Sequence, residues 1–167
     1  PSVLNLSYFS GIFTIILCPQ RHIIDQWVDN IREFGVNPII GYSGSEMKDW
    51  KKRLINAKMR FNHDKTNECF ITTNDSFSSS SVQEILRDIR GYCAIVVDEV
   101  HNMGSEKRSE KLIDTIEYRL GLSATIDRFE DPSGTEKIRE YFGKECIEYT
   151  LEEAISKGML CNYYYYP

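Results

Sequence analysis

The chain has 167 residues, of which 41% are hydrophobic and 27% are charged, and its net charge is −5. These values fit one globular domain with a sizeable core, are short for two domains, and exclude a protein coated in basic charge. No apolar run approaches the ~20 residues that cross a bilayer, so we expect a cytoplasmic protein with no membrane partner. The cysteines form no Cys-x-x-Cys pair, and Cys18, Cys69 and Cys93 lie in apolar runs, which predicts buried, reduced thiols.

Segments typical of strands and helices alternate along the chain. Hydrophobic periodicity predicts, in order, strand 13–17, helix 21–34, strand 38–42, helix 46–60, strand 68–73, a helix from 82, strand 93–98, a helix around 107–117, strand 119–124, helix 134–142, strand 146–149 and helix 151–157. Ser81 and Glu84 are spaced as a capping box for the helix from 82. Because parallel strands need crossover connections, which helices of this length supply, we expect an α/β fold with a mostly parallel, doubly wound sheet.

The most informative segment is strand 93–98, an apolar run that ends in two adjacent carboxylates, Asp98 and Glu99, followed by His101. An unpaired carboxylate is costly to bury, and ligands of open α/β sheets bind beyond the carboxyl ends of the strands. One of the two acids can reach a Mg²⁺ ion, often through its water shell, while the other orients or deprotonates an attacking water. A site that uses all three side chains as metal ligands is geometrically poor, because neighbouring side chains diverge. The alternative is a solvated acidic turn.

A second strand, 119–124, runs into small hydroxyl residues at its carboxyl end, where Ser123 and Thr125 lie. Hydroxyls at this point can bridge to the acids of an adjacent strand and form a polar network that senses a bound ligand. The alternative is an ordinary Ser/Thr turn that caps the strand. Neither residues 121–125 nor residues 41–45 complete the Gly-x-Ser-x-Gly pattern, so a hydrolase with a nucleophile elbow is a weak alternative.

Four ordered segments resemble the motifs of superfamily 2 helicases and translocases. Residues 98–101 (Asp-Glu-Val-His) resemble the Asp-Glu-x-His, or Walker B, box, and residues 123–125 (Ser-Ala-Thr) resemble motif III. Residues 18–20 (Cys-Pro-Gln), with a trailing Gln-Trp at 26–27, resemble motif Ia, and residues 70–76 resemble motif Ib. The branch most similar to the chain holds the type III restriction-subunit-like and repair-helicase-like proteins. The resemblance implies a three-layer, RecA-like P-loop NTPase domain.

This resemblance implies ATP and Mg²⁺ as cofactors and a role for each motif residue. Asp98 would hold Mg²⁺ on the nucleotide phosphates, through water, and Glu99 would position and activate the hydrolytic water. His101 would connect this catalytic site to motif III, where Ser123 and Thr125 would transmit the nucleotide state. The implied activity of the full-length protein is ATP hydrolysis coupled to unwinding of DNA or translocation along it.

The resemblance also implies two partners. Pro19, Gln20 and Thr73 would lie along a nucleic-acid strand and contact its phosphates, which positions the strand without reading its sequence. We expect DNA rather than RNA. Superfamily 2 motors bind ATP between two RecA-like domains, so a second such domain is the other expected partner. The alternative is a non-catalytic RecA-like module that serves as an interaction scaffold for nucleic acid or protein.

One motif of the family is missing, because the P-loop pattern Gly-x₄-Gly-Lys-Ser/Thr does not occur in the 167 residues. Residues 1–6 resemble the helix that follows a P-loop, and the segment after Leu151 is too short for a second RecA-like domain. We therefore expect residues 1–167 to be RecA-like domain 1 within a longer protein, inactive when isolated. Natural loss of nucleotide binding is the alternative.

Other features have plainer explanations. Arg128 is expected to be a surface arginine in an acidic loop, and Trp27 and Trp50 fall on apolar stripes that predict core positions. Residues 163–166 are four tyrosines that are expected to begin a strand. Six cations form either a nucleic-acid track or, as we favour, a solvated helix face: Lys48, Lys51, Lys52, Arg53, Lys58 and Arg60.

Overall fold

A five-stranded sheet forms the centre of the protein in a computed structural model that describes residues 11–128 and 130–161. Every strand is parallel to its neighbours, in the order β2-β3-β1-β4-β5. Leu17 in the central strand lies opposite both Thr72 and Val97, so the carboxyl ends of the three middle strands are level. The strands are β1 (Phe13–Cys18), β2 (Ile39–Gly41), β3 (Glu68–Thr73), β4 (Cys93–Asp98) and β5 (Tyr118–Leu122).

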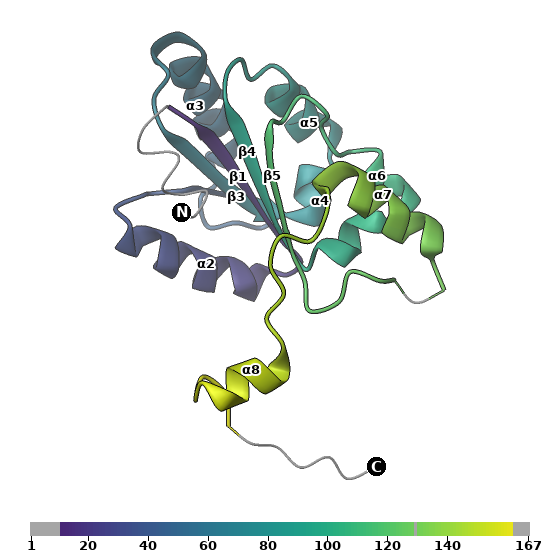
Figure 1. Ribbon diagram of the computed structural model, residues 1–167. Coiled ribbons are helices and arrows are strands. Elements are labelled where there is room, and N and C mark those ends of the chain that lie inside the picture. The colour runs from purple at the N-terminus through teal and green to yellow at the C-terminus, as the bar shows by residue number, and fades with distance from the viewer. Residues whose placement is uncertain (1–10, 129, 162–167) are drawn as a thin grey trace.

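Helices cover both faces of the sheet and give three layers (Figure 1). One face carries α2 (Arg21–Glu33). The helices of the opposite side are α3 (Trp50–Asp64), α4 (Asn74–Phe77), α5 (Ser80–Arg87), the 3₁₀ helix η1 (Val100–Gly104), α6 (Glu106–Ser109) and α7 (Pro132–Phe142). A last helix, α8 (Leu151–Ser156), stands apart from these layers in Figure 1. The predicted α/β fold with a doubly wound sheet is confirmed.

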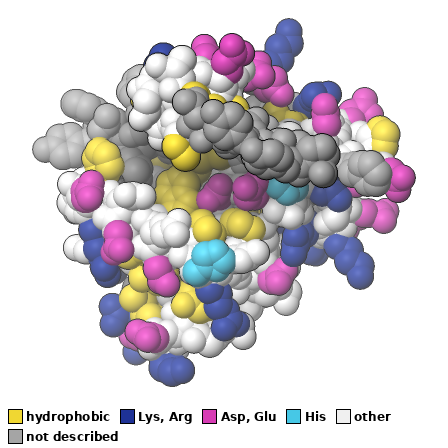
Figure 2. Space-filling model, turned by 90° about the horizontal axis from the view of Figure 1, so that it is seen from below, with side chains coloured by type: hydrophobic (Ala, Val, Ile, Leu, Met, Phe, Trp, Pro, Cys, Tyr) yellow, Lys and Arg dark blue, Asp and Glu magenta, His cyan; other side chains and the backbone are white. Residues whose placement is uncertain are grey.

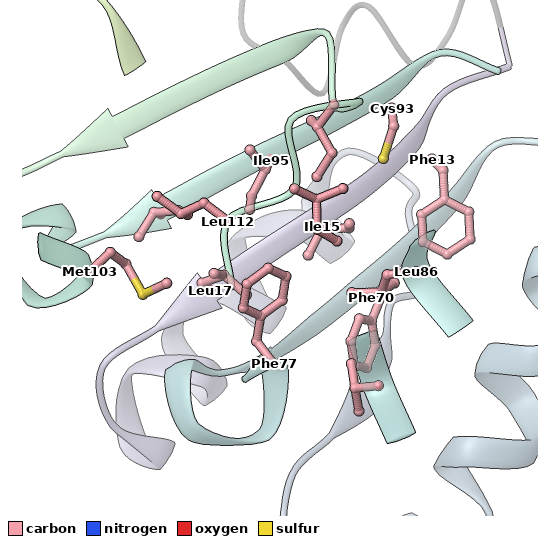
Figure 3. Packing of buried hydrophobic residues seen from close by; sticks show 14 of the residues in the cluster. Phe13, Ile15, Leu17, Phe70, Phe77, Leu86, Cys93, Ile95, Met103 and Leu112 are labelled. Carbon is pink, nitrogen blue, oxygen red and sulfur yellow. The ribbon is translucent and has the colours of Figure 1, made fainter. Parts of the chain in front are cut away.

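Alternate residues of the strands enter two separate cores, because successive side chains of a strand point to opposite faces. Phe13, Ile15 and Leu17 of β1 point to the larger core, beneath α3, α5 and α7 (Figure 3). The Phe13 ring meets Phe61 edge-on there, with the ring centroids 5.6 Å apart. Ile16 and Cys18 point the other way and pack under the buried face of α2, which consists of Ile24, Val28 and Ile31. Both cores anchor β1, and with it the carboxyl-terminal edge of the sheet.

The contact between α3 and β2 depends on a glycine. A Cβ atom at Gly41 would overlap the ring of Trp50, the first residue of α3. With no side chain in the way, the Trp50 ring stacks on Phe70 of β3, with the centroids 6.0 Å apart and the planes 17° apart. Trp50 therefore lies in the core, as its apolar stripe predicted.

The helix predicted around 107–117 is wrong, because only α6 is helical in that region. Carbonyls that a continuing helix would pair with its own amides accept hydrogen bonds from side chains beyond the segment. The Ile113 carbonyl accepts from the Tyr141 hydroxyl at 2.8 Å, and the Asp114 carbonyl accepts from the Arg119 guanidinium at 2.6 Å. These tertiary contacts hold the chain in turns that lead into β5.

The strand predicted at 146–149 is also wrong. No strand is assigned there, and Ile147 is 81% exposed. Strand propensity is realised only where a neighbouring strand and a packed face are present, and the described residues provide neither for this segment. The helix start predicted near Ser81 is shifted as well. α5 begins at Ser80, and its N-cap residue Ser79 donates its hydroxyl to the carbonyl of Ser76 at 2.6 Å, so the expected capping box does not form.

The start of α3 and the end of α2 also differ from the predicted residues. α3 begins at Trp50 rather than at 46, after a turn in which the Ser45 hydroxyl donates to the Ile40 carbonyl at 3.0 Å. α2 ends at Glu33, and Phe34 is 62% exposed rather than on the buried face. The expectations for residues 1–6 and 163–166 lie outside the described residues. No helix within the described ranges has both the length and the apolar character to cross a membrane.

Candidate functional site

The structure brings the predicted site residues to one edge of the sheet, where the strands end. Thr73 closes β3 and lies opposite Cys18, the last residue of β1, which is followed by Pro19 and Gln20. Asp98 closes β4, opposite Leu122 at the end of β5, and Ser123 follows directly. Figure 2 looks onto this edge and shows acidic and histidine side chains next to hydrophobic ones.

Asp98 is held in place by donors from two different elements. Its Oδ1 accepts a hydrogen bond from the backbone N–H of Glu99, and its Oδ2 accepts one from the indole N–H of Trp27 in α2, both at 3.0 Å. The Cys18 thiol lies nearby, and burial, reinforced by the negative charge of Asp98, raises the pKa of that thiol to about 12. Asp98 is therefore a half-buried carboxylate with a defined orientation, next to a thiol that stays protonated.

Glu99 occupies a strained turn directly after the strand. Its φ of 48° lies in the left-handed region, which costs a residue with a side chain about 1–3 kcal/mol. The turn is secured by Asn102, whose backbone N–H and side-chain amide both donate to the Glu99 carbonyl, at 2.9 and 3.1 Å. Because β4 ends at Asp98, Glu99 lies in the turn after the strand. The direction of its side chain is therefore set by the turn and not by the alternation of side chains along a strand. Strain of this kind clusters at functional sites.

His101 joins the acidic turn to the end of β5. Its Nδ1 lies 2.9 Å from the Ser123 hydroxyl oxygen and 3.3 Å from Oε2 of Glu99. The single proton of the Ser123 hydroxyl is donated to the Thr125 carbonyl at 2.6 Å. Ser123 must then accept from His101, so Nδ1 of His101 carries a proton. One N–H thus faces both the Glu99 carboxylate and the Ser-Ala-Thr segment.

Thr125 takes part in this network through its backbone. Its carbonyl accepts the Ser123 hydroxyl, while the residue itself is exposed. The expected bridge between the acidic turn and the hydroxyl segment therefore exists as a contact, made by His101 and Ser123.

Arg128 is not the surface arginine that the sequence predicted. Its side chain is only 20% exposed, and its guanidinium donates to the backbone carbonyl of His101. Its Nε pairs with Oδ2 of Asp131 at 2.8 Å, and Asp131 caps α7 by accepting from the amide of Gly134 at 2.8 Å. The ion pair with Arg128 is the main reason that the pKa of Asp131 lies below its usual value. Arg128 therefore connects the start of α7 to the histidine of the acidic turn.

Two glycines make room for this connection. A Cβ atom on Gly104 would lie 2.5 Å from Cδ of Arg128 and 2.7 Å from the carbonyl oxygen of Gly134. Both glycines are buried, and they let η1 and α7 approach closely.

The residues predicted to contact nucleic acid occupy different local settings. Gln20 is exposed at the N-cap position of α2, where its side chain makes no capping bond, and Pro19 is half-buried. Thr73 is the N-cap of α4, and its hydroxyl oxygen accepts from the amide of Ser76 at 3.3 Å. Gln20 is therefore free to meet a ligand, whereas the hydroxyl of Thr73 is engaged within the protein.

An open cavity of about 440 Å³ lies beside Thr73, beyond the ends of β2 and β3. Sequence reasoning did not select it, and the signal that could have found it is the cluster of small polar residues with two lysines after β2. The residues that line it are Tyr42, Ser43, Gly44, Ser45, Lys48, Trp50, Lys51, Asp75, Ser76 and Ser79.

Most of the remaining cations of the basic cluster are paired with acids, as expected of a solvated helix face. The pairs are Arg53 with Asp49 at 3.0 Å, Lys58 with Asp88 at 2.7 Å, and Arg60 with Glu68 at 2.8 Å. Lys48 and Lys51 line the cavity, and Nζ of Lys51 donates to the Ser81 hydroxyl at 3.0 Å.

The donor set at Asp98 fits magnesium better than a protein-caged metal. Among residues 11–128 and 130–161, no group of three or more His, Cys, Asp or Glu side chains is placed to hold a metal ion. Mg²⁺ typically binds through one or two carboxylates, with water and substrate phosphates completing its octahedron. A single oriented carboxylate at a half-exposed sheet edge meets that requirement.

The comparison with known families agrees with this geometry. A family model described as "Type III restriction enzyme, res subunit" matches residues 5–128. That range contains the whole sheet and every candidate residue named above. A search of curated proteins gave no significant match. The chain therefore belongs to the family of the type III restriction enzyme res subunit, which has a RecA-like fold and forms helicase-like, ATP-dependent motor domains.

Proposed function

We propose that this chain is the first RecA-like domain of a superfamily 2 helicase or translocase, which couples ATP hydrolysis to movement along DNA or to its unwinding. One observation carries the proposal. A carboxylate oriented from two sides, Asp98, a carboxylate on a strained turn, Glu99, and the His101–Ser123 bridge meet at the edge where open α/β sheets bind their ligands.

In this proposal, the two acids have separate tasks. Bound Mg²⁺ and ATP would supply the charge neutralisation and the scissile phosphate bond. Asp98 would hold the water shell of the ion, because its orientation is already set by Trp27 and the Glu99 amide. Glu99 would orient the attacking water and accept its proton, as a positioned carboxylate does in general base catalysis. The 167 residues contain no P-loop pattern, so the triphosphate would need one from elsewhere in the protein.

The coupling role of motif III follows from the shared N–H of His101. This proton lies between the Glu99 carboxylate and the Ser123 hydroxyl, at 3.3 and 2.9 Å from their oxygens. A shift of the segment after β5 would strengthen one of these contacts at the cost of the other. The position of Glu99 would then depend on the position of Ser123 and Thr125, which a second RecA-like domain would influence across the nucleotide.

The nucleic-acid strand would follow the ends of β1, β3 and β2. Pro19 and Gln20 follow β1, and Thr73 closes β3. The cavity with Lys48 and Lys51 extends the path to the end of β2. Lysines contact phosphates as point charges and make binding salt-dependent. Replacing both lysines by alanine should weaken binding to all sequences equally and lower the slope of binding affinity against salt.

The experiment that tests the proposal is an ATPase assay on the full-length protein with single-stranded DNA, duplex DNA or RNA added. We expect hydrolysis that depends on Mg²⁺ and is stimulated by DNA more than by RNA. A non-catalytic scaffold would bind nucleic acid without any hydrolysis. That result would contradict the motor function and support the interaction scaffold.

Glu99→Gln gives the sharpest single-residue test. It should retain ATP binding and lower kcat by about 10²- to 10⁴-fold, the usual contribution of a general base. Glu136→Gln, on the exposed side of α7, is the matched control for loss of one negative charge. Turnover of Glu99→Gln at the wild-type rate would remove Glu99 from its proposed role.

A further inference from the structure

Trp27 makes a contact that its place in the apolar pattern does not require. The buried stripe of α2 is formed by Ile24, Val28 and Ile31, and Trp27 lies beside it, half-buried. Its indole N–H spans from α2 to the end of β4 and donates to Oδ2 of Asp98 at 3.0 Å. A packing role alone would be served by any large apolar ring.

The acceptor makes this bond significant. Hydrogen bonds to an ionised group are roughly twice as strong as those between neutral groups. The bond also fills one lone-pair direction of Oδ2, while the Glu99 amide fills one of Oδ1. The remaining directions of the carboxylate are thereby restricted, which is how neighbouring donors tune a group that binds a metal ion.

We propose that Trp27 is a positioning residue for Asp98, which sets the Mg²⁺ affinity of the site. Its position in the chain adds a second consequence. Trp27 belongs to α2, and this helix starts directly after Pro19 and Gln20, so a strand bound at those residues would act on Asp98 through the indole. The inference rests on the proposed function, because it gives Asp98 its role in holding Mg²⁺.

Two substitutions separate hydrogen bonding from packing. Trp27→Phe keeps an apolar ring and removes the N–H. Trp27→His removes the second ring but keeps an N–H, because the imidazole Nε2 occupies the same place in its five-membered ring as the indole Nε1. The assays should run at about pH 8, where the substituted histidine is neutral. Tyr118→Phe is the control, since it also removes an aromatic donor and lies at the first residue of β5, the end of that strand away from Ser123.

The measurement is binding of a fluorescent ATP analogue to the full-length protein as Mg²⁺ is titrated. For Trp27→Phe we expect the Mg²⁺ concentration at half-saturation to rise by about 10- to 100-fold, the usual effect of losing such a partner. Trp27→His should stay close to the wild type, and so should Tyr118→Phe. Unchanged Mg²⁺ dependence in Trp27→Phe overturns the proposal, and so does a larger loss in Trp27→His than in Trp27→Phe, which is the order that packing predicts.

A second measurement does not use the nucleotide. In a Trp50→Phe background, Trp27 is the only tryptophan left among the 167 residues, and a change of emission on substitution of its acceptor reports the indole environment. Asp98→Asn should change that emission, because the charged acceptor is lost, whereas Asp127→Asn, at an exposed pair with Arg139, should not. An Asp98→Asn spectrum identical to that of its parent overturns the contact. Absence of any Mg²⁺-dependent nucleotide binding by the wild type, with the emission change intact, overturns the proposed function and the Mg²⁺ role of Trp27 with it.

Discussion

The Nδ1 atom of His101 lies 2.9 Å from the hydroxyl oxygen of Ser123, which joins the acidic turn after β4 to the segment after β5. The two residues are 22 positions apart in the chain. Because the Ser123 hydroxyl gives its proton to the Thr125 carbonyl, the direction of the bond is set, and His101 is the donor. This proton therefore lies between the two segments that we propose to be coupled.

Ser123→Ala removes the hydroxyl that accepts from His101. Loss of the acceptor leaves the His101 N–H with the Glu99 carboxylate, at 3.3 Å, as its neighbouring acceptor. We expect Glu99 to be drawn toward the imidazole, so that stimulation of ATPase activity by DNA falls by about tenfold, in line with the ~1.4 kcal/mol of one hydrogen bond. The ratio of stimulated to basal rates measures it. Thr125→Val, which keeps the accepting carbonyl, should show a smaller loss, and an equal loss in both variants would contradict this network.

Arg128→Ala should destabilise the fold by about 1–3 kcal/mol, because the carbonyl of the half-buried His101 loses its donor. The Asp131 carboxylate loses a donor as well. Urea unfolding measures the change. Arg128→Lys should recover only part of it, since an ammonium group does not reproduce the two-sided geometry of the guanidinium. Full recovery by lysine would show that charge, rather than geometry, matters at this position.

The pH dependence of stability should show the Asp131 ion pair. The pKa of Asp131 is lowered in the folded protein, so its contribution to stability is present above the unfolded value and is lost as pH falls through the folded pKa. The difference in Tm between the wild type and Asp131→Asn should be constant from about pH 5 to about pH 8 and shrink below about pH 4. Asparagine can still cap α7 through its one carbonyl oxygen and Gly134, so the substitution removes the ion pair with Arg128 and keeps the cap. A difference that persists unchanged at about pH 3 would rule out this interpretation.

Cysteine labelling tests the packing of the sheet. Cys18, Cys69 and Cys93 are buried, and burial raises the pKa of each thiol to about 12, whereas Cys146 and Cys161 are exposed. A maleimide reagent at about pH 7 should modify the two exposed cysteines quickly and the other three only after unfolding. Mass spectrometry of peptides identifies the labelled positions. Rapid labelling of Cys18 in the native protein would contradict its placement under α2.

Much of the fold could be predicted from local patterns. Strand 68–73 and strand 93–98 have the predicted boundaries, because each is a short apolar run between clear turn signals. The predictions failed where long-range contacts override local preference. Residues 107–117 have helical periodicity, yet the hydroxyl of Tyr141, 28 residues further along the chain, donates to the Ile113 carbonyl that a helix would use. Segment 146–149 has strand propensity without a neighbouring strand to pair with in the described structure.

The residues of the candidate site could likewise be predicted only in part. Asp98, Glu99, His101 and Ser123 follow two strands in the sequence, so their place at one edge of a parallel sheet can be predicted. Trp27 was assigned to the core, since a tryptophan on an apolar stripe has the same periodicity whether or not its N–H is used. Arg128 was assigned to the surface, since three acidic neighbours in the sequence suggest a solvated loop.

The alternation of strands and helices can be predicted from the chain alone, and so can the acids and hydroxyls that follow two of the strands, because these properties depend on neighbouring residues. Which groups contact those acids and hydroxyls depends on the fold. The Trp27–Asp98 bond joins residues 71 positions apart, and the Arg128–His101 bond joins residues 27 positions apart. Such contacts depend on the order of strands in the sheet and on how closely the helices pack, which no local pattern specifies.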